Sequence, residues 1–363
     1  MNRIESDMKI GIIHPAMNVM GGAEMTTFAL IEELKKTSHS STLYCVKAPN
    51  ILSTENFQIK KIPSYKFPLF WRYLRLKENK KLFQISNKED LLFIMGGGLI
   101  IEKTPVRNVF QYCHSTFSAE ENFLKNKSGG IKSFYNTILQ QNIEKSFSYL
   151  KNEQIKLISN SNFTKEEILK RIKKKSIVIY PPVEITRFLQ FYKIPKIKKV
   201  ITISRYSNEK NLDFAVDIMN ELNIDYEIVG NALHKKQFDV FNHLRKIANN
   251  LISLKCNITQ QERDNLLSST KIYFHPSEET FGISVIESIA SGCIPIVPNN
   301  SAHIETVPFK VLRYDNKNDA LKKIQGAIKG EFDYLLPKLK EHITKFSKER
   351  FQDEIIQLLK EVK

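Results

Sequence analysis

Short apolar runs alternate with longer segments of helical periodicity along the whole chain. The apolar runs, each expected to be a buried strand, are 9–14, 42–46, 90–95, 108–113, 156–159, 176–180, 200–204, 226–229, 251–254, 271–274 and 294–297. The segments with apolar residues three and four apart are expected to be helices, at 23–36, 132–150, 165–171, 212–222, 235–249 and 260–268. Alternation of this kind predicts parallel sheets, so the expected fold class is α/β with two doubly wound domains.

The domain division is expected near a lysine-rich break. The chain has 363 residues, and a domain usually takes about 100–200. The segment Lys193–Lys199, KIPKIKK, is interpreted as the linker. The predicted regions are a first domain at 1–195, a second at 196–340 and a C-terminal helical region at 341–363. In that last region a helix over 346–362 would place Phe351, Ile355, Leu358 and Leu359 on one face.

The net charge of +16 is unevenly distributed. Residues 1–190 hold 29 Lys and Arg against 17 Asp and Glu, whereas the rest of the chain is nearly balanced. A basic half favours an anionic partner such as a membrane surface, a nucleic acid or a phosphorylated substrate. A general lysine bias of the source proteome would give the same composition.

Neither a targeting segment nor a membrane span is expected. The first fifteen residues carry charges and only a short apolar run, unlike a signal peptide. The longest apolar stretch, Leu91–Ile101, is about half the length that a membrane span needs. The four cysteines form no CxxC pair, which argues against a zinc or redox site and favours buried thiols. We expect a cytoplasmic protein, with association at the cytoplasmic face of a membrane as an option.

The segment Tyr65–Phe83 interleaves six basic residues with six aromatic ones and includes Trp71. This composition suits a membrane interface, where rings lie at headgroup level and lysines meet anionic lipid. It would also suit single-stranded nucleic acid. An ordinary amphipathic helix with a basic solvated face is the third interpretation.

The segment His275–Gly292, HPSEETFGISVIESIASG, is predicted to run from the end of a strand through an acidic loop into a helix. A helix N-terminus offers free N–H groups to an anion such as phosphate, and carboxylates suit hydroxyl groups. Phosphate and hydroxyls together suggest a nucleotide sugar. Acids in the first turn of a helix are also common because they favour its dipole.

Other strand ends of the second half carry compatible residues. Arg205 and Lys210 follow one strand, where two cations could hold a diphosphate, and Gly230 follows the next, where a ligand could approach the backbone. All these ends lie on one edge of a parallel sheet. In the first half His114 follows a strand in the same way, with a purely structural role as its alternative.

The constellation resembles the retaining glycosyltransferases of family 4, which have the GT-B fold. The family's E-x7-E motif stands here as Glu279 to Glu287, with Phe281-Gly282 between the acids. Its Arg and Lys motif stands as Arg205 and Lys210. Other segments that resemble family motifs are Gly21-Gly22-Ala23-Glu24, His114, Ser161–Lys165 and Phe346–Arg350. Tyr180-Pro181-Pro182-Val183 is similar to the mannosyltransferases that extend lipid-linked oligosaccharides, although two prolines also make a stiff turn.

The resemblance implies two Rossmann-like domains facing across a cleft, with a last helix crossing back to the first domain. It implies that Arg205 and Lys210 hold the donor diphosphate, that Glu287 binds the ribose and that Glu279 contacts the sugar. Backbone N–H groups near Phe281, Gly282 and Ile283 would help to bind the donor. His114 would contact the donor sugar from the first domain, and the loop at Gly22 would line the acceptor side.

The expected activity is therefore transfer of a hexose from a nucleotide sugar, with mannose and GDP-mannose favoured, to a lipid-linked or surface-glycan acceptor. Front-face attack and double displacement both stay open. No DxD metal motif stands out and Asp225-Tyr226-Glu227 reads as a strand edge, so we expect neither a metal nor a cofactor. The alternatives are a nucleotide-sugar 2-epimerase and a non-enzymatic basic membrane- or nucleic-acid-binding protein. The choice of Glu279 over its neighbour Glu278 rests only on the spacing to Glu287.

Overall fold

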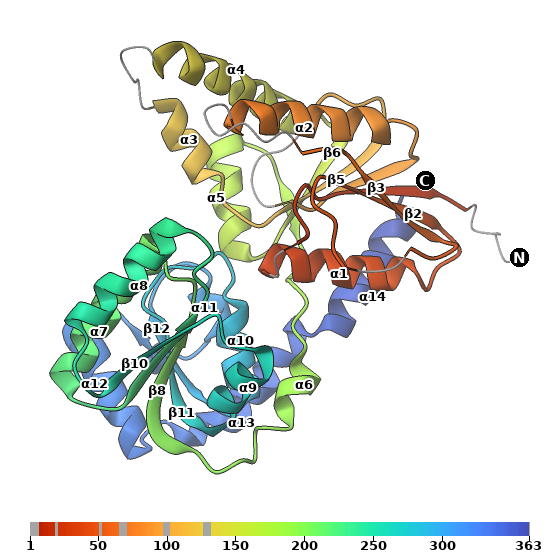
Figure 1. The fold of residues 1–363 in the computed structure, drawn as a ribbon. Coiled ribbons are helices and arrows are strands. Elements are labelled where there is room, and N and C mark those ends of the chain that lie inside the picture. The colour runs from red at the N-terminus through yellow and green to blue at the C-terminus, as the bar shows by residue number, and fades with distance from the viewer. Residues whose placement is uncertain are drawn as a thin grey trace, which may run out of the picture. The chain divides into compact units, whose positions relative to one another are not determined.

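The chain forms two compact units, each built on its own parallel sheet (Figure 1). The computed structural model describes residues 7–18, 21–50, 53–64, 71–96, 102–125 and 132–362. Unit 1 comprises residues 1–182 and 351–363, and unit 2 comprises residues 183–350. In the described ranges no helix combines the length and the apolarity that crossing a membrane requires.

Unit 1 has a seven-stranded sheet in the order β3-β2-β1-β4-β5-β6-β7, with every pairing parallel. Its strands are β1 (Lys9–Ile13), β2 (Ser40–Cys45), β3 (Phe57–Lys61), β4 (Leu91–Ile94), β5 (Asn108–Cys113), β6 (Ile155–Ser159) and β7 (Ser176–Val178). Its helices are α1 (Gly22–Leu34), α2 (Trp71–Ser86), α3 (Ser118–Lys125), α4 (Lys132–Leu150), α5 (Asn162–Ile172) and most of α14 (Lys348–Lys360).

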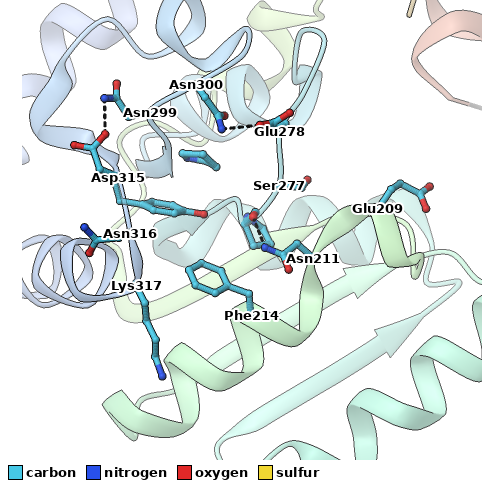
Figure 2. Close-up of a pocket in the computed structure, with 13 residues that line it drawn as sticks. Glu209, Asn211, Phe214, Ser277, Glu278, Asn299, Asn300, Asp315, Asn316 and Lys317 are labelled. Atoms are coloured by element: carbon cyan, nitrogen blue, oxygen red, sulfur yellow. Dashed lines mark hydrogen bonds between the residues drawn. The ribbon is translucent and has the colours of Figure 1, made fainter. Parts of the chain in front are cut away.

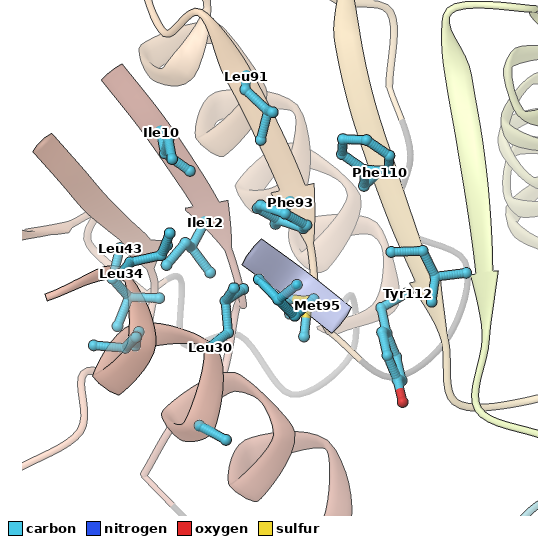
Figure 3. Close-up of a cluster of buried hydrophobic side chains, with 14 of the residues drawn as sticks. Ile10, Ile12, Leu30, Leu34, Leu43, Leu91, Phe93, Met95, Phe110 and Tyr112 are labelled. Carbon is cyan, nitrogen blue, oxygen red and sulfur yellow. The ribbon is translucent and has the colours of Figure 1, made fainter. Parts of the chain in front are cut away.

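The last helix completes the core of unit 1. Apolar side chains of β1, β4 and β5 form a buried cluster with Leu30 and Leu34 of α1 (Figure 3). Phe351 and Ile355 of α14 are buried in the same cluster. The ring of Phe351 lies 6.4 Å from that of Tyr112 on β5. The expected return of the C-terminal helix to the first unit is therefore confirmed.

Unit 2 has a six-stranded sheet in the order β10-β9-β8-β11-β12-β13, again with every pairing parallel. Its strands are β8 (Ile197–Ile203), β9 (Tyr226–Gly230), β10 (Ile252–Cys256), β11 (Thr270–Phe274), β12 (Ile294–Pro298) and β13 (Arg313–Tyr314). Its α-helices are α6 (Ile185–Leu189), α7 (Leu212–Leu222), α8 (Lys235–Ile247), α9 (Gln260–Ser269), α10 (Ile283–Ala290), α11 (His303–Thr306), α12 (Lys317–Lys329) and α13 (Leu336–Ile343).

Both sheets reverse their strand order beside the first strand of the unit, as doubly wound folds do. The predicted fold class of two Rossmann-like α/β domains is confirmed. In unit 2 the reversal lies between β8 and β11, so the loops that leave these two strands are neighbours. That crevice is where ligands bind in open α/β sheets.

The linker interpretation of Lys193–Lys199 is wrong. Strand β8 already begins at Ile197, and Lys196 is tied into unit 2 through hydrogen bonds from its ammonium to the carbonyls of Phe191, Ser268 and Ser291. The lysine-rich composition suggested a solvated linker, but the Lys196 ammonium donates hydrogen bonds to carbonyl groups within unit 2. The contact-based division falls earlier, after Pro182.

Candidate active site

Three strand ends of unit 2 carry the residues singled out from the sequence. The loop after β8 holds Arg205 and Lys210, strand β9 ends at Gly230, and the loop after β11 holds Glu279 and leads into α10, which carries Glu287. Because β8 and β11 are adjacent and parallel, their loops meet at the same edge of the sheet. Lys210 sits at the end of a short 3-10 helix, η2 (Asn208–Lys210), which turns the chain toward α7.

Lys210 and Glu279 form the ion pair at the centre of this edge. The Lys210 ammonium donates a hydrogen bond to Oε1 of Glu279, and both side chains are largely buried, at 15% and 19% exposed. His275 at the end of β11 adds a second bond to that oxygen, Nε2 to Oε1 at 2.9 Å. Burial alone would raise the pKa of Glu279, but the His275 hydrogen bond and the Lys210 charge lower it well below its usual range. The carboxylate is therefore held ionised.

His275 is a member of this cluster that the sequence reasoning missed. Its side chain is 1% exposed, and Nδ1 lies 3.3 Å from the Tyr273 hydroxyl. Tyr273 in turn donates a hydrogen bond to Ser284 Oγ in the first turn of α10. This chain of contacts fixes both the carboxylate and the start of the helix. The signal was its place directly after a buried strand, four residues before Glu279.

The structure distinguishes the two adjacent acids. Glu278 is exposed and accepts a hydrogen bond from the Asn300 amide at 2.8 Å (Figure 2). It lines a pocket of unit 2 that does not include Glu279. Of the two acids, Glu279 contacts Lys210 and His275, whereas Glu278 contacts Asn300.

Helix α10 presents free donors beside the ion pair. Gly282 is its N-cap in the left-handed region, with φ of +90°, a conformation that side chains disfavour. Within the described part of the chain, the N–H groups of Ile283 and Ser284 have no hydrogen-bond partner. Phe281 is buried, with its ring 5.3 Å from that of Phe346, and so anchors the loop. The arrangement suits an anion at the helix N-terminus.

Glu287 lies one turn farther into α10, where it is 3% exposed. Burial raises the pKa of Glu287, and the Arg263 guanidinium, whose NH1 lies 3.7 Å from Oε2, opposes that effect. Arg263 belongs to α9 and is more accessible, at 26% exposed. Arg263 was not singled out in the sequence, where it is one charged residue within a predicted helix.

Arg205 and Gly230 differ from expectation in what they touch. Arg205 does not share the buried pair: it is 62% exposed, and its guanidinium lies 3.6 Å from a carboxylate oxygen of Glu209. A side chain at Gly230 would place its Cβ 1.9 Å from the Ser204 carbonyl oxygen. The absence of a side chain at Gly230 therefore serves the packing of β9 against the loop after β8, before any ligand is considered.

The remaining predicted residues lie in unit 1. Gly22 is the first residue of α1. His114 follows β5, and its Nε2 lies 3.0 Å from the Met95 carbonyl oxygen. Burial, together with the nearby charge of His14, lowers the pKa of His114 to about 4, which keeps the ring neutral near pH 7. Gly22, His114 and the Met95 carbonyl all belong to unit 1.

His14 and Glu24 form an ion pair in unit 1 that the sequence did not reveal. His14 Nε2 lies 3.3 Å from Glu24 Oε1, and His14 Nδ1 lies 2.8 Å from the Thr27 hydroxyl. Glu24 was known only as part of a glycine-containing loop. Its carboxylate also lies within 2.8 Å of where a Cβ on Gly21 would stand, so this glycine leaves room for the pair.

The remaining chemical expectations concern metals, thiols and the basic segment. The described residues include no cluster of three or more His, Cys, Asp or Glu that could hold a metal ion. All four cysteines are free, and Cys256 alone is not fully buried. In the basic segment, 65–70 lie outside the described residues. The rest forms α2, which exposes Arg75, Lys77, Lys80 and Lys81 and buries Leu82 and Phe83.

Comparisons with known proteins agree with the two-domain fold. Residues 186–350 match the family model described as "Glycosyl transferases group 1". A tRNA-queuosine alpha-mannosyltransferase from Drosophila melanogaster is 25% identical over 192 residues, covering 49% of this chain and 51% of the relative. The chain thus spans about half the length of the curated relative that it matches.

Solved structures match nearly the full chain at low identity. A glycosyltransferase from Rickettsia africae ESF-5 aligns with a TM-score of 0.70 and 17% identity, covering 98% of this chain and 99% of that one. HepE of Anabaena in complex with UDP-glucose aligns with a TM-score of 0.70 and 16% identity, covering 97% and 99%. WaaG, a glycosyltransferase of lipopolysaccharide biosynthesis, aligns with a TM-score of 0.68 and 11% identity, covering 95% and 99%. Residues 186–350, which are less than half of the chain, are therefore similar to group 1 glycosyltransferases, and the chain has the fold of the aligned glycosyltransferase structures.

Proposed function

We propose that the protein is a retaining hexosyltransferase that uses a nucleotide-sugar donor. The observation that carries the proposal is the Lys210–Glu279 pair at the switch point of unit 2, beside the free N–H groups of α10. A cation, a fixed carboxylate and a helix N-terminus at one edge match a diphosphate linked to a polyhydroxylated sugar.

Each group has a distinct task in this proposal. Lys210 and Arg205, with the N–H groups of Ile283 and Ser284, face the diphosphate. As the bond to the sugar breaks, negative charge grows on the departing diphosphate, so these groups stabilise the transition state more than the ground state. Lys210 has three donors, and its bond to Glu279 leaves two for phosphate oxygens.

Hydroxyl groups are the remaining targets. Glu279, held ionised, would accept hydrogen bonds from the transferred sugar, and Glu287 beside Arg263 would receive the ribose. His114 and the loop at Gly22 in unit 1 would complete the donor-sugar and acceptor sides.

For the sugar we propose mannose from GDP-mannose, with a lipid-linked or surface-glycan acceptor. The mannosyltransferase relative supports the sugar, whereas the complex of HepE with UDP-glucose makes UDP-glucose the competing donor. The basic charge of residues 1–190 supports an acceptor borne on an anionic surface or polymer. Because the relative's name includes tRNA, the acceptor panel should include tRNA beside glycolipids.

The decisive experiment is nucleotide release from a donor panel of GDP-mannose, UDP-glucose, UDP-galactose and GDP-glucose, with and without acceptors. We expect GDP release from GDP-mannose, increased by the correct acceptor. Preference for a UDP-sugar would replace the sugar assignment and keep the transferase. Formation of an epimer without acceptor would instead favour the 2-epimerase, and no turnover of any donor would contradict the enzyme proposal.

We further expect turnover without a divalent metal, because Lys210 and Arg205 can neutralise the leaving diphosphate. Treatment with excess EDTA, followed by removal of the chelator, should leave the rate of nucleotide release unchanged within about twofold. Loss of activity that Mg²⁺ or Mn²⁺ restores would show that the metal, and not the two cations, does this work.

A further inference from the structure

Unit 2 contains an open pocket whose lining does not include Lys210, Glu279 or Glu287. Its volume is about 590 Å³, within the range of small-molecule sites. It lies where α7 and α12 begin, at the ends of β12 and β13 (Figure 2). Its polar lining consists of Glu209, Asn211, Ser277, Glu278, Asn299, Asn300, Asp315, Asn316 and Lys317.

The pocket and the donor helix lie on different sides of the sheet. Helix α12 packs against α7, whereas α10 packs against α6 and α13. Figure 1 shows α7, α8 and α12 on one face of the unit 2 sheet and α9, α10 and α13 on the other. Glu287 on α10 does not line the pocket, and neither does Lys210, although its neighbours Glu209 and Asn211 do. The loop at 276–279 forms the boundary between the two sites.

The charge of the lining excludes most anionic ligands. Three carboxylates line the pocket, those of Glu209, Glu278 and Asp315. The one ammonium, that of Lys317, is paired outside the pocket with Asp217 at 2.7 Å and Glu221 at 2.9 Å. The Arg205 guanidinium lies 3.6 Å from Glu209, so the negative charge of the lining comes from Glu278 and Asp315, and it would repel a phosphate or a uronic acid.

Two carboxylates are held in place by asparagine amides. Asn299 donates to Asp315 Oδ1 at 2.6 Å, and Asn300 donates to Glu278 Oε1 at 2.8 Å (Figure 2). Among the described residues, the second oxygen of each carboxylate has no hydrogen-bond donor. These oxygens are pre-positioned acceptors for hydroxyl groups.

An aromatic wall completes the pocket. The rings of Phe214 and Tyr314 are stacked, with centroids 6.0 Å apart at an interplanar angle of 30°. Tyr314 is fixed by a hydrogen bond from its hydroxyl to the His275 carbonyl at 3.2 Å, and Phe214 is half-buried at the pocket wall. Such a wall offers an apolar face to the C–H side of a sugar ring.

We propose that this pocket is a second saccharide-binding site, which takes a neutral sugar unit and lies apart from the donor residues. Carboxylates and amides bind the hydroxyls, the aromatic wall packs against the ring, and the negative charge selects against phosphorylated or acidic sugars. The proposal goes beyond the transferase function and does not depend on it.

Binding of neutral mannose and glucose disaccharides to the full chain, measured by saturation-transfer NMR and calorimetry, tests the site. Asp315→Ala and Glu278→Ala should each weaken binding about tenfold, because each removes a hydrogen bond to a charged group. Asp225→Ala is the matched control, since Asp225 is exposed and lies before β9, at the opposite edge of the sheet. Saturating GDP or UDP should leave saccharide binding in place.

Three results would overturn the proposal: unchanged affinity in both pocket variants, displacement of the saccharide by nucleotide, or tighter binding of sugar phosphates than of neutral sugars. Absence of any saccharide binding would do the same. Because this assay contains no donor, its failure would leave nucleotide release, and with it the proposed transferase, untouched. A chain that binds saccharides but releases no nucleotide would keep the pocket and lose the transferase.

Discussion

In the Lys210–Glu279 pair, the carboxylate is held ionised and a cation lies beside it. Replacement of either partner by alanine should lower donor turnover at least about a hundredfold, the usual cost of removing a group that stabilises transition-state charge. Nucleotide release measures the effect, and thermal unfolding confirms that the variants fold.

The matched control for this pair is Lys271, which pairs with Asp333 at 2.9 Å. Its side chain is 17% exposed, close to the 15% of Lys210, but it lies at the start of β11 and not at the end. Lys271→Ala should cost similar stability and leave turnover unchanged. Equal turnover in the Lys210 and Lys271 variants would remove the active-site assignment.

His114 offers a test that does not require activity. The pKa of His114 in the folded protein is about 4, below the value of 6.5 for a solvent-exposed imidazole, because burial disfavours the charged ring. A group whose charged form is disfavoured by folding contributes stability fully above pH 6.5, and that stability is lost as pH falls from 6.5 toward 4.

The measurement is an NMR titration of the His114 ring together with urea unfolding at pH 7 and pH 5. We expect a midpoint near pH 4, and a smaller loss of stability between pH 7 and pH 5 in His114→Gln than in the natural protein. A midpoint near 6.5 would show that the ring is solvated and freely protonated.

At this scale the sequence predicted residues but not their partners. Glu279, Lys210 and His114 stood out because each comes after a buried strand, and Glu287 stood out because it lies eight residues after Glu279. His275, Arg263 and the His14–Glu24 pair did not, because a single buried histidine or a helical arginine has no distinguishing pattern. These contacts join side chains across loops and between neighbouring helices, and one sequence does not specify how those segments pack.

At the scale of elements, the N-terminus of α10 depends on one backbone conformation. Gly282 has φ of +90°, and a Cβ there would lie 3.3 Å from Val285 Cγ2. Gly282→Ala should cost about 1–2 kcal/mol, the usual penalty for a left-handed residue with a side chain. It should also raise the KM for donor, because the helix start would move relative to the diphosphate.

Gly330→Ala is the control for this change. Gly330 has φ of +88° at the C-terminus of α12 and faces Asp333. Both variants should lose comparable stability in urea unfolding, but only Gly282→Ala should change the KM. A normal donor KM in Gly282→Ala would mean that the N–H groups of α10 do not bind the donor.

Strand β5 and helices α4 and α7 have the predicted bounds. Strand β3 was missed because it is an edge strand whose sequence, FQIKK, has only Phe57 buried. Strand β13 was missed because it has only two residues.

For the whole molecule, the uneven charge predicts contact with anionic surfaces. The chain should sediment with vesicles that contain phosphatidylglycerol at about 0.1 M salt and be released at about 1 M, where the Debye length falls from about 10 Å to about 3 Å. Changing Lys77, Lys80 and Lys81 of α2 to glutamate should weaken this binding, because these lysines are exposed on a helix whose apolar side is buried.

The control variant changes Lys235, Lys236 and Lys246 of α8 to glutamate, with the same loss of charge on exposed positions of unit 2. Equal loss of binding in the two variants would mean that total charge, and not α2, drives the contact. Binding to neutral vesicles that salt does not reverse would contradict the electrostatic explanation.

The two-unit α/β organisation could be predicted from the sequence because the strand–helix alternation runs through both halves. The position of the division could not, because Lys193–Lys199 has the composition of a linker and yet enters β8. Composition describes solvation on average, whereas the carbonyls that bind Lys196 come from segments far along the chain.

Unit 2 is inserted between two parts of unit 1 in the sequence, and its first and last residues lie close together. Val183 N donates to the Phe346 carbonyl at 3.0 Å, and Lys348 N donates to the Val183 carbonyl at 3.1 Å. The segments at the beginning and the end of unit 2 therefore run side by side in an isolated parallel bridge. Closing a loop across ends that already touch costs little entropy. Residues 183–350 could therefore be exchanged as a cassette between related chains without stretching either junction. If unit 2 binds the donor as proposed, such an exchange would change donor specificity, whereas Phe351 and the rest of α14, which complete the core of unit 1, would stay.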